Sequence, residues 1–288
     1  MTERMIEANG VELCTEAFGD HGDPAVLLVM GVGGSMLWWE DDFCRMLAGR
    51  RRFVIRYDHR DTGRSATCPP GRPGYTGADL ENDAVRVLDG YGVHAAHVVG
   101  VSAGGGFAQL LALDFADRVR SLVLISTCPA TPGDRDLPSP TDDFIKFVAT
   151  ARVDWADSDS VIDYLVDYSR VLCGHQRRFD EEACREFVRR DVARTRNVAA
   201  LQNHDAMKDH PRAYPALSSI TAPTLVIHGT ADPMFPPRHG EALAAEIPGA
   251  QLSFLEGAGH GIDQADWNTV ASAIVEHTTA GKQPDHVG

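Results

Sequence analysis

Apolar positions in the first 128 residues follow two alternating patterns. Short runs are mostly apolar, as in parallel strands that are covered on both faces, and they occupy residues 25–30, 53–57, 96–101 and 119–125. Between these runs, apolar side chains recur at helical spacing, in residues 37–47, 79–88 and 103–116. This alternation predicts a mostly parallel, doubly wound α/β sheet.

The pattern changes after residue 128. A proline-rich, polar stretch, residues 129–140, is typical of a linker, and residues 141–217 show helical periodicity alone. Alternation of strand and helix then resumes at residues 223–228, 238–247, 251–255 and 264–277. We therefore expect one α/β core interrupted by a helical cap insertion and followed by a disordered tail. The expected bounds are 1–128 and 218–278 for the core, 129–217 for the insertion and 279–288 for the tail.

The segment Gly100-Val101-Ser102-Ala103-Gly104 has the pattern G-x-S-x-G. An apolar strand leads directly into it and an amphipathic helix follows, which is the context of a nucleophile elbow. The serine could also act only as the N-cap of that helix, but a cap does not require such a cluster of glycines. We expect Ser102 to be a nucleophile at a helix N-terminus, where the dipole favours developing negative charge.

A serine nucleophile needs a neighbouring base and an acid that orients the base. His260 lies in the glycine-rich segment 257–261, directly after a predicted strand, and Asp232 lies in the loop after the strand at 223–228. Both would face the same sheet edge as the serine, in the chain order nucleophile, acid, base. The alternative base is His228, which lies inside a strand and would be structural. The alternative acids are Asp263 and Asp266, which would cap the last helix.

An oxyanion hole needs backbone N–H donors. One donor is expected from Ala103, directly after the nucleophile, and the other from the glycine-rich loop 30–34, where Val32 is the first choice and Gly33 the alternative. The same glycines could form an ordinary turn. A phosphate-binding role is less well supported, because no Lys-Ser/Thr pair follows the loop and the glycine spacing does not fit a dinucleotide fingerprint.

The insertion is expected to roof an apolar pocket above the serine. The candidate walls come from the loop after the first apolar run and from the insertion: Met36, Trp38, Trp39, Phe144, Phe147 and Trp155. Aromatic residues at such spacing also occur in ordinary core packing. A large planar or hydrophobic ester is expected rather than a charged one.

Composition and charge limit the kinds of molecule that the protein is expected to bind. The formal net charge of −14 repels nucleic acid and anionic lipid, so we expect a small-molecule partner. The N-terminus lacks a basic segment followed by an apolar stretch, and the six cysteines are scattered without a C-x-x-C pair, which predicts a cytoplasmic protein with reduced thiols. No metal or other cofactor is expected, because His204, Asp205 and His210 are typical of a solvated helical region.

Several of these segments together resemble a known group. They occur in family order: Met30-Gly31, residues 56–65 with the sequence RYDHRDTGRS, the elbow at Ser102, the Asp232 loop and residues 257–260. The chain resembles the α/β-hydrolase superfamily, and within it the aclacinomycin methylesterase type, which acts on aromatic polyketides. The resemblance covers residues 1–128 and 218–278. It implies a serine esterase with the triad and the two oxyanion-hole amides named above.

Two further expectations come from this resemblance. Asp58 and Arg60 look like a structural ion pair that braces the loop beneath the site. The substrate would be a carboxylic ester of a hydrophobic, aromatic polyketide-type small molecule, cleaved through an acyl-enzyme. Carbon–carbon bond hydrolases, lactonases and cofactor-free peroxidases use the same triad, so these activities stay open, as does a non-catalytic or cyclase-like binding protein.

Overall fold

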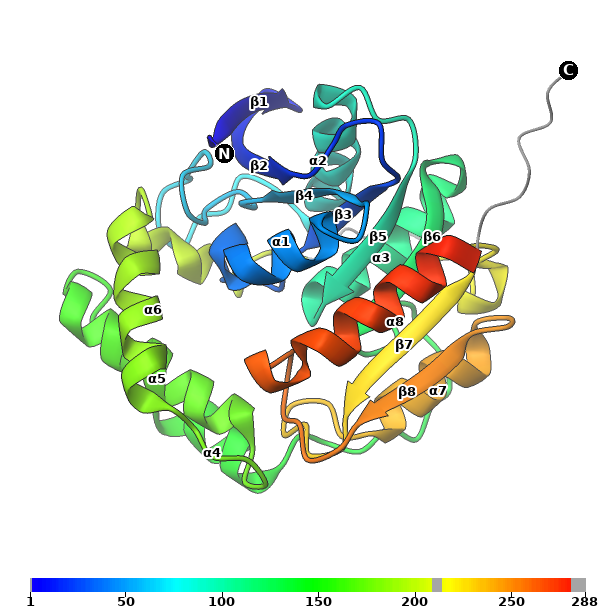
Figure 1. The fold of residues 1–288 in the computed structure, drawn as a ribbon. Coiled ribbons are helices and arrows are strands. Elements are labelled where there is room, and N and C mark those ends of the chain that lie inside the picture. The colour runs from blue at the N-terminus through cyan, green and yellow to red at the C-terminus, as the bar shows by residue number, and fades with distance from the viewer. Residues whose placement is uncertain (1, 209–213, 281–288) are drawn as a thin grey trace, which may run out of the picture.

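The computed structural model describes residues 2–208 and 214–280. Eight strands form one sheet in the order β1-β2-β4-β3-β5-β6-β7-β8 (Figure 1). Strand β2 runs antiparallel to both of its neighbours, and the pairs from β4 to β8 are parallel. The strands are β1 (Arg4–Ala8), β2 (Val11–Phe18), β3 (Ala25–Val29), β4 (Phe53–Tyr57), β5 (Ala96–Val101), β6 (Val119–Ile125), β7 (Thr224–Gly229) and β8 (Gln251–Leu255). The mostly parallel sheet predicted from the sequence is confirmed.

The hairpin of β1 and β2 was not expected from the sequence. Its turn, Asn9-Gly10, has positive φ at both residues (49° and 77°), which is the conformation of a tight hairpin turn. The two strands mix polar and apolar residues, and β1 buries only alternate positions near its end. An antiparallel edge of this kind has no continuous apolar run, so the pattern that reveals the parallel strands does not reveal this hairpin.

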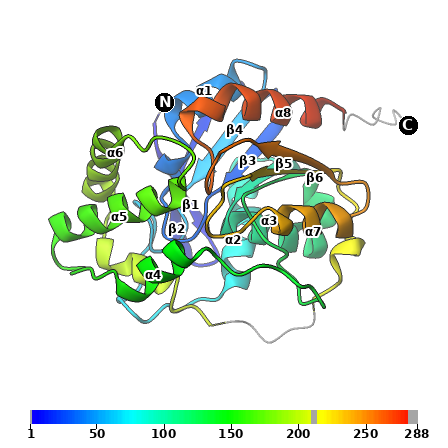
Figure 2. The same cartoon turned by 90° about the horizontal axis from the view of Figure 1, so that it is seen from below.

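Helices cover both faces of the sheet (Figure 2). Helices α1 (Asp41–Ala48) and α8 (Trp267–Ala280) pack on one face. Helices α2 (Gly77–Gly90), α3 (Ala103–Asp114) and α7 (Arg238–Glu246) pack on the other. Each layer buries a cluster of apolar side chains against the sheet, so the apolar runs of the central strands are enclosed from both sides.

Two predicted boundaries are corrected by the structure. Helix α1 begins at Asp41, four positions later than expected, because residues Met36–Trp38 form a separate 3-10 helix capped by Ser35. Helix α8 continues to Ala280, so the first two residues of the expected tail are helical. The rest of that tail, residues 281–288, lies outside the described residues.

The insertion between β6 and β7 is helical. Its first part, residues 129–141, contains neither helix nor strand, and its helices are α4 (Asp142–Thr150), α5 (Ser158–Cys173) and α6 (Glu181–Arg194). It has a small apolar cluster of its own around Val161, Val166 and Val188. Figure 1 shows these helices beside the sheet, at the end where the parallel strands lead into their loops.

The described residues also form four short 3-10 helices besides Met36–Trp38. They are Ala116–Arg118, Val198–Asn203, Leu217–Ser219 and Gln264–Asp266. No helix in the ranges 2–208 and 214–280 has the length and apolarity needed to cross a bilayer.

Candidate active site

Ser102 lies in a sharp turn between β5 and α3. Its backbone has φ 56° and ψ −128°, a conformation that is costly for a residue with a side chain and that is characteristic of a nucleophile elbow. The flanking glycines are required by close packing. A Cβ on Gly100 would lie 2.3 Å from the Gly104 carbonyl oxygen, and one on Gly104 would lie 2.3 Å from the Val29 carbonyl oxygen. The turn therefore presents the serine at the carboxyl edge of the sheet.

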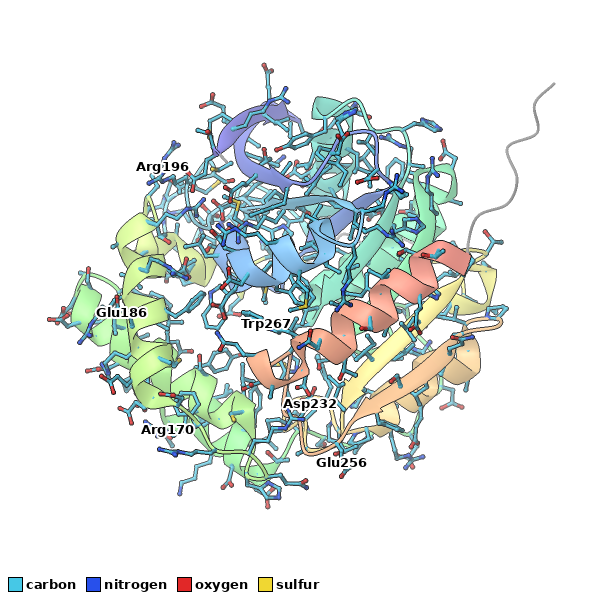
Figure 3. The ribbon with its side chains drawn as sticks, in the orientation of Figure 1. Arg170, Glu186, Arg196, Asp232, Glu256 and Trp267 are labelled. Atoms are coloured by element: carbon cyan, nitrogen blue, oxygen red, sulfur yellow. The ribbon has the colours of Figure 1, made fainter. Side chains whose placement is uncertain are left out.

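Asp232 and His260 are joined by a hydrogen bond. His260 follows β8 and Asp232 follows β7, and Nδ1 of the imidazole lies 2.9 Å from Oδ2 of the carboxylate. Oδ1 of Asp232 also accepts the amides of Met234 and Phe235, each at 2.9 Å. Burial by itself would raise the pKa of Asp232, but the interactions with His260 and the backbone amides hold that pKa below its ordinary value. The carboxylate is thus charged and able to orient the imidazole (Asp232 is labelled in Figure 3).

The segments that carry Ser102 and His260 are tied together through β6. The Ser102 amide donates to the carbonyl oxygen of Ile125 at 3.0 Å, and the hydroxyl of the next residue, Ser126, accepts the Gly261 amide at 3.0 Å. These two bonds hold the serine turn and the histidine loop on neighbouring strand ends. Among the described residues, Ser102 Oγ has no hydrogen-bond partner. Hydrogen bonds between catalytic groups are often long or poorly aligned before substrate binds, and they tighten in the complex with substrate.

The alternative acids and base have other partners. His228 is buried, and its Nε2 contacts the Phe235 carbonyl oxygen at 2.7 Å. Asp263 caps the short helix Gln264–Asp266, whereas Asp266 pairs with Arg177 from the insertion at 2.5 Å. Nε2 of His228 also lies 3.7 Å from Oδ2 of Asp232, which is too long for a hydrogen bond. The shorter contact of His260 with the same carboxylate, at 2.9 Å, therefore favours His260 as the candidate base.

The glycine-rich loop after β3 lies against the serine. A Cβ on Gly31 would come within 3.1 Å of Ser102 Cβ and 3.6 Å of its Oγ. The amides of Val32 and Ala103 have no acceptor among the described residues, whereas the Gly33 amide donates to Nδ1 of His204 at 2.7 Å. This occupation of the Gly33 amide favours Val32 over Gly33 as the second donor of an oxyanion hole.

The insertion contacts the loops of both Asp232 and His260. The His260 amide donates to the Leu172 carbonyl oxygen near the end of α5, at 2.8 Å. A Cβ on Gly259 would lie 2.2 Å from the same oxygen, and one on Gly174 would lie 2.8 Å from the Ala231 carbonyl oxygen. The end of α5 is thus packed directly on the loops that carry the candidate base and acid.

Two of the predicted substrate-binding residues are core residues. Trp39 is 1% exposed and stacks on Phe43 beneath α1, and Met36 is fully buried. Neither side chain has surface to offer a substrate, which corrects the prediction for both. Trp38 is partly exposed, but its Nε1 donates to Asp191 at 2.9 Å and its ring packs edge-on against Phe187. It therefore joins the loop after β3 to α6.

The predicted aromatic residues of the insertion form one cluster. Phe144 and Phe147 contact Tyr168, and Trp155 contacts Tyr164, with ring centroids 5.7–6.3 Å apart across the cluster. Burial and the nearby Tyr164, Asp205 and Asp232 raise the pKa of Tyr168.

The expected ion pair between Asp58 and Arg60 is not formed. Asp58 pairs with Arg194 of α6 at 2.8 Å and accepts the amides of Met36 and Arg64. Arg60 instead makes two bonds to Asp83 of α2, at 2.7 and 2.8 Å. The two side chains therefore brace the loop by separate routes, because each has a partner of opposite charge on a different helix.

His204 is also placed differently from the prediction. It was expected to be solvated, but it is 5% exposed and hydrogen-bonded to the loop after β3. Its partner lies 171 positions away in the sequence, so no local pattern could have revealed the contact. Over residues 2–208 and 214–280, no group of three or more His, Cys, Asp or Glu side chains could hold a metal ion. His210 lies outside the described residues.

Comparison with known proteins identifies the family. Residues 24–262 match the family model described as alpha/beta hydrolase fold. The chain is 34% identical to rhodomycin D methylesterase DnrP of Streptomyces peucetius and to DauP of Streptomyces sp. strain C5, in each case over 97% of this chain and 99% of the relative. The enol-lactonase of Burkholderia xenovorans LB400 superimposes with a TM-score of 0.71 at 26% identity, over 96% of this chain and all of that chain. The resemblance found in the sequence is confirmed, and the chain belongs to the α/β-hydrolase fold family.

Proposed function

We propose that this protein is a carboxylic ester hydrolase with Ser102 as nucleophile, His260 as general base and Asp232 as the orienting acid. The observation that carries the proposal is the 2.9 Å contact between His260 Nδ1 and Asp232, at the sheet edge where Ser102 stands in a strained turn. The 34% identity to two methylesterases supports an ester as the substrate.

The mechanism follows from this arrangement. Ser102 Oγ attacks the ester carbonyl carbon while Nε2 of His260 takes the hydroxyl proton. The amides of Val32 and Ala103 bind the resulting oxyanion, and each such donor is worth roughly 10²–10³ in kcat. Collapse breaks the ester C–O bond, and His260 returns the proton to the leaving alcohol. Water, deprotonated by His260, then attacks the acyl-enzyme and releases the carboxylic acid and Ser102.

For the substrate, we propose a methyl ester of a hydrophobic, aromatic polyketide-type molecule. The aromatic cluster of Phe144, Phe147, Trp155, Tyr164 and Tyr168 supports a planar, apolar partner, because aromatic rings stack on one another in offset or edge-on geometry. The exposed Val32 side chain adds apolar surface beside the serine. The six free thiols support a cytoplasmic location, where cysteines stay reduced.

A lactone is the second candidate substrate. An enol-lactonase is 26% identical over nearly the whole chain, and a lactone is an internal ester that the same triad opens. Ring opening leaves the alcohol attached to the acyl group, whereas hydrolysis of a methyl ester releases methanol. The products therefore separate the two activities.

The experiment is a panel of aromatic polyketide methyl esters, simple aryl methyl esters and aryl lactones, incubated in ¹⁸O-labelled water. We expect methanol release and one ¹⁸O atom in the new carboxylate, because water attacks the acyl carbon. Ser102→Ala should lower turnover by about 10⁶-fold, and Ser139→Ala, in the linker, is the control. Turnover of the methyl esters by Ser102→Ala near the wild-type rate would refute the proposal.

A further inference from the structure

Two buried histidines hold the loop after β3 on either side of the Val32 amide. Nε2 of His59 lies 2.8 Å from the Met30 carbonyl oxygen, and Nδ1 of His204 accepts the Gly33 amide at 2.7 Å. His59 therefore fixes the Met30–Gly31 peptide, and His204 fixes the peptide after Val32. The peptide that carries the Val32 N–H lies between these two fixed planes.

This loop needs external support. Its residues 31, 33 and 34 are glycines, and Gly33 has φ +74° with no atom within 4 Å of the place of a Cβ. Glycine gives the backbone the widest choice of conformations, so the chain itself does not determine where the Val32 N–H points. Among the described residues, the only backbone hydrogen bond within this turn runs from the Gly34 amide to the Gly31 carbonyl oxygen, and it is long, at 3.4 Å.

The hydrogen bonds of His204 define one tautomer. Nδ1 must be unprotonated, because it accepts from an amide, and Nε2 must carry the hydrogen, because it faces the Arg60 carbonyl oxygen at 2.8 Å. If Nδ1 carried a proton, its N–H would face the Gly33 N–H and the hydrogen bond between them would be lost. The neutral imidazole thus connects two backbone segments, 30–34 and 58–65, that carry the candidate oxyanion donor and its support.

The surroundings of His204 keep the imidazole neutral. Burial lowers its pKa, although the Arg60 carbonyl and the charges of Asp61 and Asp205 act in the opposite direction. The other groups that face the ring are His59 and Tyr75, with centroids 6.2 and 6.3 Å away. Asp61 is itself held by the Tyr75 hydroxyl at 2.7 Å and by the Asn203 amide at 2.9 Å.

We propose that His204 is a positioning residue of the oxyanion hole, which orients the Val32 N–H toward the reacting carbonyl oxygen through its bond to Gly33. The inference rests on the proposed serine hydrolase function. It adds that the insertion, which carries His204, helps to fix the loop of the oxyanion hole. Its effect should fall on stabilisation of the transition state, not on binding of the substrate.

Three substitutions separate the two hydrogen bonds of His204. In His204→Asn, the amide oxygen can take the place of Nδ1 and accept the Gly33 N–H. In His204→Gln, the longer side chain can reach only the Arg60 carbonyl oxygen. His204→Phe keeps an aromatic ring and removes both hydrogen bonds. We expect kcat to fall on the order of tenfold for Gln and Phe, less than the roughly 10²–10³ of losing an oxyanion donor. KM should stay nearly unchanged, and Asn should restore most of kcat.

The decisive readout is the adduct of Ser102 with an aryl-alkyl trifluoromethyl ketone, followed by ¹⁹F NMR. Attack of the serine gives a hemiketal whose oxygen ionises in the oxyanion hole. We expect its pKa to rise by about one unit in the Gln and Phe variants, which corresponds to about tenfold weaker stabilisation, and to stay near the wild-type value in Asn. His97→Asn, a buried histidine at the start of β5 that bonds Ser121 at 2.8 Å, is the control for stability.

The outcomes distinguish this inference from the proposed function. An unchanged hemiketal pKa in folded His204→Gln and His204→Phe, with wild-type kcat, would overturn the role of His204 and leave the esterase proposal standing. A loss of kcat that Asn does not restore, with an unchanged hemiketal pKa, would reduce His204 to a structural residue and also overturn it. Failure of the wild type to form the adduct at all would count against Ser102 as the nucleophile.

Discussion

The backbone N–H of His260 donates to the carbonyl oxygen of Leu172 at 2.8 Å, across the boundary between the core and the insertion. The last turn of α5 therefore helps to hold the loop that carries the imidazole. Arg177, just beyond α5, reinforces this contact through a two-pronged bond to Asp266 and a bond to the Glu256 carbonyl oxygen. The position of the insertion and the position of the candidate base are thus linked.

Gly259→Ala tests this link. A Cβ at Gly259 would lie 2.2 Å from the Leu172 carbonyl oxygen and 2.4 Å from that of Cys173, so the histidine loop or the end of α5 must move. We expect a loss of roughly 10²-fold in kcat/KM, the size of effect that a shift of about 1 Å can cause. Gly106→Ala in α3 is the control, because its Cβ would meet only the Ala130 Cβ at 3.8 Å. Equal activity of both variants in an ester assay would contradict the link.

Asp232→Asn tests the role of the acid. The amide keeps the size of the carboxylate but removes the charge that stabilises the imidazolium and selects the tautomer, so kcat should fall on the order of 10⁴-fold. The matched control is Asp263→Asn, three residues after His260, where the side chain only caps a short helix. Its kcat should stay close to wild type. A similar kcat for the two variants would show that Asp232 does not orient the base.

His59 predicts a dependence of stability on pH. Burial, aided by the neighbouring His204, lowers the pKa of His59 from 6.5 to about 3. Between these two values the unfolded chain binds a proton that the folded chain does not, so stability is lost as the pH falls. The free energy of unfolding should decrease through this group by up to about 1.4 kcal/mol per pH unit.

Denaturant unfolding of the wild type and of His59→Gln, from pH 7 down to pH 4, measures this contribution. Glutamine can still donate to the Met30 carbonyl oxygen but does not titrate. We expect the variant to lose less stability than the wild type for each unit of acidification. Parallel curves for the two proteins would mean that His59 is protonated equally in the folded and unfolded states.

The pair of Arg60 and Asp83 is expected to matter for stability. Asp83 has no exposed side-chain surface, and Arg60 has 10%. Asp83→Asn would leave the buried guanidinium without its counter-charge, at a cost of about 3–5 kcal/mol in the free energy of unfolding. Asp42→Asn breaks an exposed pair with Arg45 and should leave the free energy of unfolding close to the wild-type value, because solvent screens such pairs. Equal losses in thermal or denaturant unfolding would contradict the importance of the buried pair.

The sequence predicted the central part of the fold and the three candidate catalytic residues because the signals are local. The central parallel strands are mostly apolar runs, and Ser102, Asp232 and His260 each follow a strand in a segment that contains glycine or proline. Close packing around Ser102 requires glycine at positions 100 and 104, so the motif that reveals the nucleophile spans only five residues. The family resemblance pointed to the same positions.

The features that the sequence did not predict depend on distant contacts. Whether Trp39 faces a pocket or the core is decided by its packing against α1 and β4, not by its spacing, and the spacing of Met36 likewise does not reveal that it is fully buried. The partners of Asp58 and Arg60 lie on α6 and α2, and His204 meets Gly33 only after the insertion folds over the loop. Patterns of one segment cannot reveal such pairings, because they arise where two segments meet.

The central claim is that Ser102 is a nucleophile activated by His260. Intact mass and peptide mapping after treatment with a fluorophosphonate probe measure this directly, because the probe forms a stable bond only with an activated serine. We expect stoichiometric labelling of the peptide that contains Ser102, labelling slowed severely in a folded His260→Gln variant, and none in Ser102→Ala. Labelling at another serine, or an unmodified Ser102 in the folded wild-type protein, would contradict the account.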